Sequence, residues 1–409
     1  MKKQEQYVDN WIREQTGLGS ALTAENLRAW QQERVREAEI YAAEHAAFYR
    51  DRKEALLSPE PGQHFFITAE DIRRRPEDFL CVSPKEIARI ITIPTSGSTG
   101  RPKRIFFTEE DLMATADFFT PGMAYMTEPG QLVTVFMEGE QVYSIGGLLR
   151  IALERREIST RVHGFVHDLK EAEQAAQGAD CLVGVPGQMA FLAEAAPKLR
   201  PKTVLLSGDY VPQSVVRRLE SIWECEVFQH WGMTETGYGG GVECGAHCGY
   251  HLRDADLMIE IIHPETGESV PNGTWGEVVF SAFARKGMPL LHYRTGDIGR
   301  FCPDACGCGG VLPRLDKVMG RIENTIFLHN GDAISIHQLD EVLFALDGVH
   351  DYAAKLKQNP EATLSLTIEG DADPDMITEF IHKKWSGLEI RVNSGIVERK
   401  RKRSIVREK

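Results

Sequence analysis

The chain lacks the features that mark a membrane or exported protein. It has no run of about 18 apolar residues, roughly the length that spans a bilayer. Its polar first residues, 1–5, do not form the apolar core of a signal peptide. Internal repeats and low-complexity tracts are also absent. The formal net charge of −13 at pH 7 disfavours binding to nucleic acid or to an anionic membrane surface. We therefore expect a cytoplasmic protein that binds neither.

A Walker phosphate-binding sequence is missing as well, but residues 95–103 carry a different pattern. Their spacing, G-x-x-G-x-x-K, does not fit the Walker sequence and disfavours a P-loop NTPase. Glycines let backbone amides approach an oxyanion, hydroxyls donate to it, and a lysine adds positive charge. An ordinary turn rich in Ser, Thr and Gly is the alternative. The residues expected to hold phosphate are Thr95, Ser96, Gly97, Ser98, Thr99, Gly100 and Lys103.

The order of the predicted elements indicates an α/β fold. A length of 409 residues with 42% hydrophobic content allows a large core and a second domain. Short apolar strands alternate with helices, which predicts mostly parallel sheets flanked by helices. A long helix is expected over residues 23–50, and Thr68 and Thr108 open capping-box sequences with Asp in the reciprocal position. The predicted strands are 132–136, 181–185, 204–206 and 227–228, and the helices between them include 167–177 and 212–223.

The pattern changes in the last third of the chain. From about residue 255, apolar strands joined by turns predict a β-rich, antiparallel subdomain. We place a domain boundary after residue 322, which gives a large domain of residues 1–322 and a small, mobile α+β domain of residues 323–409. The small domain ends in a basic run, residues 398–403, although the chain as a whole is acidic.

Four further segments carry polar side chains suited to a ligand site. Residues 207–209 follow a predicted strand, and α/β sheets bind ligands at the carboxyl ends of their strands. Residues 230–236 offer an aromatic face, a close-approach glycine, a hydroxyl and a carboxylate. Residues 293–297 end in a carboxylate that can accept from both hydroxyls of a ribose, and residues 320–324 lie at the predicted boundary. Each segment alone could be an ordinary loop, but their occurrence together with residues 95–103 favours a nucleotide site.

In this order, these residues resemble the adenylate-forming superfamily of acyl-CoA ligases, and most closely its phenylacetate-CoA ligase-like branch. The resemblance spans nearly the whole chain, from residues 44–50 to the basic run. It implies that residues 95–103 hold the β,γ-phosphates of ATP, that Thr234 contacts the α-phosphate and that Glu235 helps to bind Mg²⁺. The other nucleotide-binding positions that it implies are Ser207, Gly208, Asp209, Trp231, Gly232, Asp297 and Arg321. Trp231 stands where the family usually has a tyrosine stacked on adenine, and Asp297 and Arg321 would contact the ribose.

The resemblance also implies a catalytic lysine in the small domain. Adenylation brings a carboxylate against an α-phosphate, so Mg²⁺, amide donors and a lysine must offset the repulsion. The family's motif is similar to E-G-K-A-x-R, and residues 398–403 align Lys400 with its lysine. Arg399 stands where glycine is usual, which leaves Lys402 as a rival and a solvated basic tail as the plain alternative. Glu323 matches the acidic hinge position about which the small domain turns.

The eight cysteines require an explanation, because disulfides are rare in cytosolic proteins. Cys81, Cys181 and Cys225 are scattered, and we expect them to be buried core residues. The others form two clusters, and thiolates with an imidazole suit a closed zinc site. The resemblance favours Cys244, His251, Cys306 and Cys308 as ligands of a structural Zn²⁺, while His247, Cys248 and Cys302 are surplus candidates. Free or merely buried thiols are the alternative.

The expected function is an acid–CoA ligase. A small carboxylic acid and ATP would give an acyl-adenylate and pyrophosphate, and CoA would then displace AMP. The resemblance makes an aromatic acid the expected substrate, while residues 143–147 either line an acyl pocket or belong to the core. Two alternatives stay open: transfer to an acceptor other than CoA, such as adenylylation of a deazaflavin coenzyme, and a nucleotide-binding protein without catalysis. A homodimer is compatible with the sequence.

Overall fold

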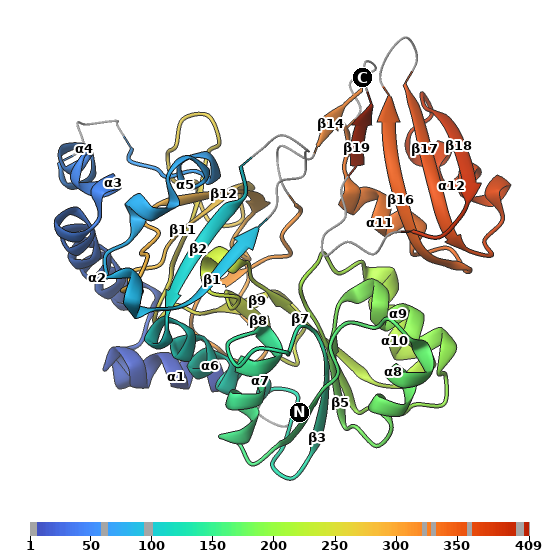
Figure 1. Cartoon of the computed structure of the whole chain (residues 1–409), viewed down its shortest axis with the longest axis horizontal. Coiled ribbons are helices and arrows are strands. Elements are labelled where there is room, and N and C mark those ends of the chain that lie inside the picture. Colours follow the sequence, from blue (N-terminus) through green and yellow to red (C-terminus); the bar gives the residue numbers. More distant parts are fainter. Residues whose placement is uncertain are drawn as a thin grey trace.

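The computed structural model describes residues 6–58, 64–93, 101–320, 325–328, 333–357, 362–397 and 405–408. The N-terminal segment forms five α-helices, drawn in blue on the left of Figure 1: α1 (Tyr7–Thr16), α2 (Ala24–His45), α3 (Ala47–Arg50), α4 (Lys53–Leu57) and α5 (Ala69–Arg74). The helix predicted over residues 23–50 is α2 followed by α3, with a break at Ala46, whose backbone is extended. No helix in these ranges is long and apolar enough to cross a membrane.

The centre of the molecule is an eight-stranded sheet with strand order β13-β9-β8-β7-β6-β5-β3-β4. Strands β4, β3, β5, β6 and β7 run parallel, and β8, β9 and β13 extend the sheet in antiparallel fashion. The bounds are β3 (Leu132–Phe136), β4 (Ser159–Val162), β5 (Cys181–Gly184), β6 (Thr203–Leu206), β7 (Glu226–Trp231), β8 (Gly241–Glu243), β9 (Tyr250–Leu252) and β13 (Arg314–Leu315). The predicted parallel sheet is confirmed.

Helices cover both faces of this sheet (Figure 1). Side chains alternate between the faces of a strand, and the two buried clusters follow that alternation: Leu205 packs with helices α6 (Glu109–Met123) and α7 (Ile145–Glu154), whereas Leu206 packs on the other face. That second face is covered by α8 (Leu169–Ala176), α9 (Pro186–Ala195) and α10 (Gln213–Trp223). The alternation along each strand therefore determines which set of helices each buried side chain packs against.

Capping residues explain where two helices begin. Thr68 and Thr108 accept hydrogen bonds from the backbone of Asp71 and Asp111, and each Asp accepts from the backbone of its threonine. These reciprocal bonds satisfy amides that have no partner inside the helix. Both predicted capping boxes are confirmed.

A β-rich part lies beside the large sheet. Its three antiparallel strands are β10 (Met258–Ile262), β11 (Gly276–Ser281) and β12 (Tyr293–Gly299), in that order. A further antiparallel pair, β1 (Ile87–Ile93) and β2 (Lys103–Thr108), flanks residues 94–100. The predicted β-rich subdomain is confirmed.

The C-terminal part has its own mixed sheet, in the order β18-β17-β16-β19. Its elements are β14 (Ile326–Phe327), β15 (Ala333–Ile334), α11 (Ile336–Leu343), β16 (Val349–Lys357), β17 (Thr363–Gly370), α12 (Pro374–Lys384), β18 (Glu389–Ser394) and β19 (Ile405–Glu408). This matches the predicted small α+β unit. One buried cluster joins its apolar residues with those of α8, α9 and α10. The boundary placed after residue 322 lies outside the described residues and stays a prediction.

Candidate functional site

An apolar cavity lies between the large sheet and the helices α6 and α7, and its empty space is about 440 Å³ when the open solvent at its mouth is included. Strand residues reach it from β5 and β6, and Met137, Ser207 and His230 reach it from the carboxyl ends of β3, β6 and β7. Ligands of α/β proteins bind at that edge of the sheet. The residues that line the cavity are Phe118, Phe119, Gly122, Met123, Met137, Ile145, Leu149, Val183, Leu205, Ser207, His230, Tyr238 and Val242.

Two polar side chains meet inside this apolar wall. Ser207 Oγ lies 2.8 Å from His230 Nδ1, while His230 Nε2 is buried and has no hydrogen-bond partner among the described residues. Burial lowers the pKa of His230 to about 4, so its imidazole is neutral at pH 7. The cavity therefore contains a neutral hydrogen-bonding pair. Of residues 143–147, Ile145 lines the cavity and Tyr143 packs against the surrounding core.

The loops after β6 and β7 bring the predicted nucleotide residues to the same edge. Gly208 has a φ of +87°, and the Asp209 carboxylate accepts from the backbone N–H of Tyr210 at 2.9 Å. The Trp231 ring packs against Gly240, where a Cβ would lie 2.6 Å from two ring carbons. A Cβ at Gly232 would collide with the backbone carbonyl of Tyr238, so this position requires glycine for packing; its role in nucleotide binding stays a prediction.

Lys103 and Glu235 form a buried ion pair. Lys103 opens β2, and Glu235 lies beside Thr234 in the short 3₁₀ helix Thr234–Thr236. The two residues are only 3% and 2% exposed. The Lys103 ammonium also lies 3.1 Å from the hydroxyl of Tyr293, and that hydroxyl lies 3.4 Å from Glu235. If Mg²⁺ binds the Glu235 carboxylate, that carboxylate contacts both the metal and the Lys103 ammonium.

Several predicted site residues lie outside the described residues. These are Thr95, Ser96, Gly97, Ser98, Thr99 and Gly100 in the phosphate segment, Arg321 and Glu323 at the boundary, and Lys400 and Lys402 in the basic run. Asp297 is described: it lies half-buried in β12, four residues after Tyr293, and its backbone N–H donates to Thr295 Oγ1 at 2.9 Å.

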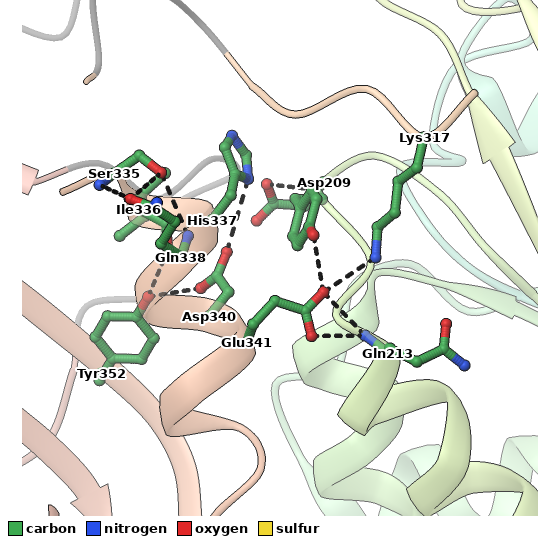
Figure 2. A network of polar contacts seen from close by, with 11 residues as sticks. Asp209, Gln213, Lys317, Ser335, Ile336, His337, Gln338, Asp340, Glu341 and Tyr352 are labelled. Atoms are coloured by element: carbon green, nitrogen blue, oxygen red, sulfur yellow. Dashed lines mark hydrogen bonds and ion pairs between the residues drawn. The ribbon is translucent and has the colours of Figure 1, made fainter. Parts of the chain in front are cut away.

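Glu341 of α11 connects the C-terminal part to the large sheet's helices (Figure 2). Its carboxylate accepts from the Tyr210 hydroxyl at 2.8 Å, from the Lys317 ammonium at 3.1 Å and from the backbone N–H of Gln213 at 3.1 and 3.2 Å. Gln213 is the first residue of α10, whose own N-cap, Pro212, supplies no side-chain cap. Glu341 therefore caps α10 from another part of the chain, as its negative charge favours.

The four predicted zinc ligands come together in the structure. One ligand atom each from Cys244, His251, Cys306 and Cys308 lies within 4.8 Å of the others, and all four residues are buried. The Cys244 and Cys306 sulfurs are 3.6 Å apart, close to the roughly 3.8 Å that two thiolates take around a tetrahedral zinc. The Cys308 sulfur lies 3.5 Å from His251 Nε2. The donor set fits a closed zinc site.

Neighbouring groups orient this cluster and separate it from the surplus candidates. Asp9 of α1 lies 3.5 Å from His251 Nδ1 and accepts from the backbone of Val311, which leaves His251 Nε2 facing the thiols. His247 is engaged instead by Glu226 and Glu243.

The other two surplus candidates are thiols outside the set. The Cys248 sulfur is 3.9 Å from the Cys306 sulfur but also lies 2.9 Å from the Arg314 guanidinium. The Cys302 thiol faces the backbone carbonyl of Cys248. Cys81, Cys181 and Cys225 are buried elsewhere, as expected.

Comparison with known proteins decides the family. A family described as AMP-binding enzyme matches residues 14–283, well over half of the chain. The chain belongs to the AMP-binding enzyme family. Curated relatives of this AMP-binding enzyme include a phenylacetate-coenzyme A ligase of Thermus thermophilus, 25% identical over 357 residues, which cover 80% of this chain and 77% of the relative. Another is a phenylacetate-coenzyme A ligase of Escherichia coli, 23% identical, with 78% and 76% covered.

Solved structures share the fold. A 2-hydroxyisobutyryl-CoA ligase in the postadenylation state superposes with a TM-score of 0.79 at 19% identity, covering 95% of this AMP-binding enzyme and 90% of that chain. In its thioesterification state, the same ligase gives a TM-score of 0.66 at 20% identity, with 97% and 91% covered.

Some site residues had no signal in the sequence. The cavity wall supplied by α6 (Phe118, Phe119 and Met123) looks like any buried helix face, because its spacing is that of a core. Tyr293 opens the segment of residues 293–297, yet only the fold brings its hydroxyl to Lys103. Glu341 has no local signal as a cap, because that role depends on α10 lying beside α11.

Proposed function

We propose that this AMP-binding enzyme is an AMP-forming acid–CoA ligase. It would activate a small carboxylic acid with ATP to an acyl-adenylate and then transfer the acyl group to CoA. One observation carries the proposal: the apolar cavity adjoins the loops that hold Ser207, Gly208, Trp231 and Gly232. The cavity is lined mainly by apolar and aromatic side chains with a few polar groups, which is typical of small-molecule sites.

The nucleotide would lie along the carboxyl edge of the parallel strands. In this proposal, residues 95–103 hold the β,γ-phosphates, Trp231 stacks on adenine, and Thr234 contacts the α-phosphate. Asp297 and Arg321 hold the ribose. Mg²⁺, bound with the help of Glu235, would neutralise phosphate charge. Lys103 lies against Glu235, so the lysine and the metal would act on the same region of the triphosphate.

The first half-reaction needs positive charge where two anions meet. The acid's carboxylate oxygen attacks the α-phosphorus, and pyrophosphate leaves. We propose that Lys400, from a small domain comprising residues 323–409, stabilises the negative charge that develops in this step. Lys402 is the alternative candidate for this role. In the second half-reaction the CoA sulfur attacks the acyl carbon and AMP leaves. The small domain would turn about Glu323 between the two steps, so that a different face of it meets the adenylate.

The cysteine cluster has a structural role in this proposal. Zn²⁺ on Cys244, His251, Cys306 and Cys308 would tie β8 and β9 to the loop before β13, at one end of the large sheet. Four protein ligands leave no open position, which favours a structural over a catalytic metal. A cytoplasmic location and a homodimer stay predictions.

Pyrophosphate release tests the function. We expect purified protein with ATP and Mg²⁺ to release pyrophosphate in response to some member of a panel of aromatic and aliphatic acids, and to form the acyl-CoA when CoA is added. An aromatic, phenylacetate-like acid is the proposed best substrate, since the named relatives include phenylacetate-coenzyme A ligases. ATP binding without acid-dependent release would contradict the proposal and favour a protein that only binds nucleotide.

Two further measurements identify the acyl acceptor and the catalytic lysine of the proposed reaction. Mass spectrometry of the products with and without CoA distinguishes a CoA ligase from an enzyme that uses another acceptor. The Lys400→Ala variant should lose adenylate formation and keep thioester formation from supplied acyl-adenylate, because the lysine acts only in the first half-reaction. If Lys402→Ala has that phenotype and Lys400→Ala does not, the assignment moves to Lys402.

A further inference from the structure

The cavity holds a polar feature that a purely apolar acid would leave unused. His230 Nε2 is buried and without a hydrogen-bond partner among the described residues, and the cavity beside it is lined mainly by Phe, Met, Leu, Ile and Val. A buried polar atom without a partner costs free energy, so its persistence in a ligand site suggests that the ligand supplies the partner. The ring itself is held: its other nitrogen is 2.8 Å from Ser207 Oγ, and Phe119 packs against it edge-on.

Building on the proposed function, we propose that His230, oriented by Ser207, recognises one uncharged hydrogen-bonding group on an otherwise apolar acid. The group is a hydroxyl, a carbonyl or a neutral amine carried by the acyl chain or ring. Ser207 is the positioning residue, and His230 is the residue that contacts the substrate and determines specificity.

The chemistry of the pair explains why the group is uncharged. A neutral imidazole has one donor and one acceptor nitrogen, and a serine hydroxyl either donates or accepts. When Ser207 donates to Nδ1, Nε2 carries the proton and donates to the ligand; when Ser207 accepts, Nε2 is the acceptor. A charged substituent would lose its hydration among apolar side chains, with no counter-charge among the described residues that line the cavity, which is strongly unfavourable.

Matched acids that differ in one polar group test this inference. We would measure acid-dependent pyrophosphate release for phenylacetate against 4-hydroxyphenylacetate and 3-hydroxyphenylacetate, and for hexanoate against 6-hydroxyhexanoate, 5-oxohexanoate, adipate and 6-aminohexanoate. The expected result is a kcat/KM at least about tenfold higher for one uncharged polar acid than for its apolar partner. The charged members should be the poorest substrates.

Variants identify the residue responsible. His230→Phe keeps a flat ring and should abolish the preference, so that the ratio of kcat/KM between each uncharged polar acid and its apolar partner falls to about one. Ser207→Ala should weaken the preference by a smaller factor, and Ser207→Thr, which keeps the hydroxyl, should restore it. His163→Phe is the control, because His163 packs against Phe136 and does not line the cavity. Thermal unfolding of each variant shows whether it is folded.

The outcomes separate this inference from the proposed function. Release with several acids but no preference for a polar member, or a preference that survives in folded His230→Phe, overturns the inference and leaves the ligase function standing. A lost preference in the His163→Phe control as well would also overturn it, because the effect would then not be specific to the cavity. Failure of the wild-type protein to respond to any acid overturns the proposed function and this inference with it.

Discussion

The two faces of the large sheet are built from alternate residues of the same strands, but they differ. The cavity lies on one face, which we call the hollow face, whereas the other, which we call the filled face, packs a buried cluster against α8, α9 and α10. Leu205 points to the face under α6 and α7, where it lines the cavity. Leu206, the next residue, is fully buried on the face under α8, α9 and α10. On that filled face the buried cluster continues into the C-terminal part through residues such as Leu339 and Leu343 of α11.

This difference separates two tasks within one sheet. The filled face provides a rigid support on which the C-terminal part rests, since close-packed interiors resist deformation. The hollow face lacks such packing contacts where the cavity lies. Polar groups follow the same division: the Ser207–His230 pair lies in the hollow, while Glu341 bridges the outer side of the filled face.

The largest expected effect comes from the end of the sheet, outside both faces. Removing the proposed zinc, by chelation or by Cys308→Ser, should lower thermal stability and solubility before it lowers activity. Metal that binds only the folded chain adds its binding free energy to the free energy of folding. For structural zinc this binding free energy is on the order of 10 kcal/mol. Elemental analysis should find about one zinc per chain. Active protein that contains no transition metal would contradict this prediction.

Two neighbouring leucines test the comparison directly. Leu206→Ala should cost about 2–5 kcal/mol of unfolding free energy, because it opens a void in the filled face. Leu205→Ala should cost less than about 2 kcal/mol, since it only enlarges an existing cavity. Urea unfolding measures both. In addition, Leu205→Ala should shift the preference among acids toward larger ones, while Leu206→Ala should not; equal losses and unchanged preferences would show that the faces do not differ.

A smaller effect is expected at the bridge to the C-terminal part. Glu341→Gln keeps the shape of the side chain and removes the charge that faces Lys317 and the start of α10. We expect a loss of about 1–2 kcal/mol, from one charged helix cap and one partly exposed ion pair. Glu379→Gln on the exposed side of α12 is the matched control, because Glu379 pairs with Lys383 across one turn of its own helix. Urea unfolding that finds equal losses in the two variants would argue against the bridge.

The smallest expected effect is the pH dependence of the stability that Glu341 contributes. Burial raises the pKa of Glu341, but the Lys317 charge and the hydrogen bonds from Tyr210, Lys317 and Gln213 outweigh it and lower the pKa below its ordinary value of 4.5. A lowered folded-state pKa contributes stability that is fully present above the unfolded-state pKa and is lost as pH falls through the folded-state value. The stability difference between wild type and Glu341→Gln should thus be constant near neutral pH and disappear in acid. A difference that grows on acidification would refute the assignment.

Local sequence signals predicted much of the fold. The capping boxes at Thr68 and Thr108 and the strand Leu132–Phe136 depend on neighbours within a few residues, so pattern alone was sufficient to find them. The four Cys and His residues were selected through the family resemblance, and the fold brings them together. In contrast, α7 and α9 were not predicted: the glycines at their starts have low helix propensity, although the alanines and leucines that follow favour a helix.

The sequence by itself determined the class of protein: alternating strands and helices, a phosphate-type segment, and the ordered motifs of an AMP-binding enzyme. Only the tertiary structure decided where the hollow lies, that Ser207 meets His230 inside it, and that Glu341 caps α10. The physical reason is the distance along the sequence between the residues that interact. Periodicity and capping are properties of neighbouring residues, whereas a cavity or a bridge depends on how side chains distant in sequence fill space together.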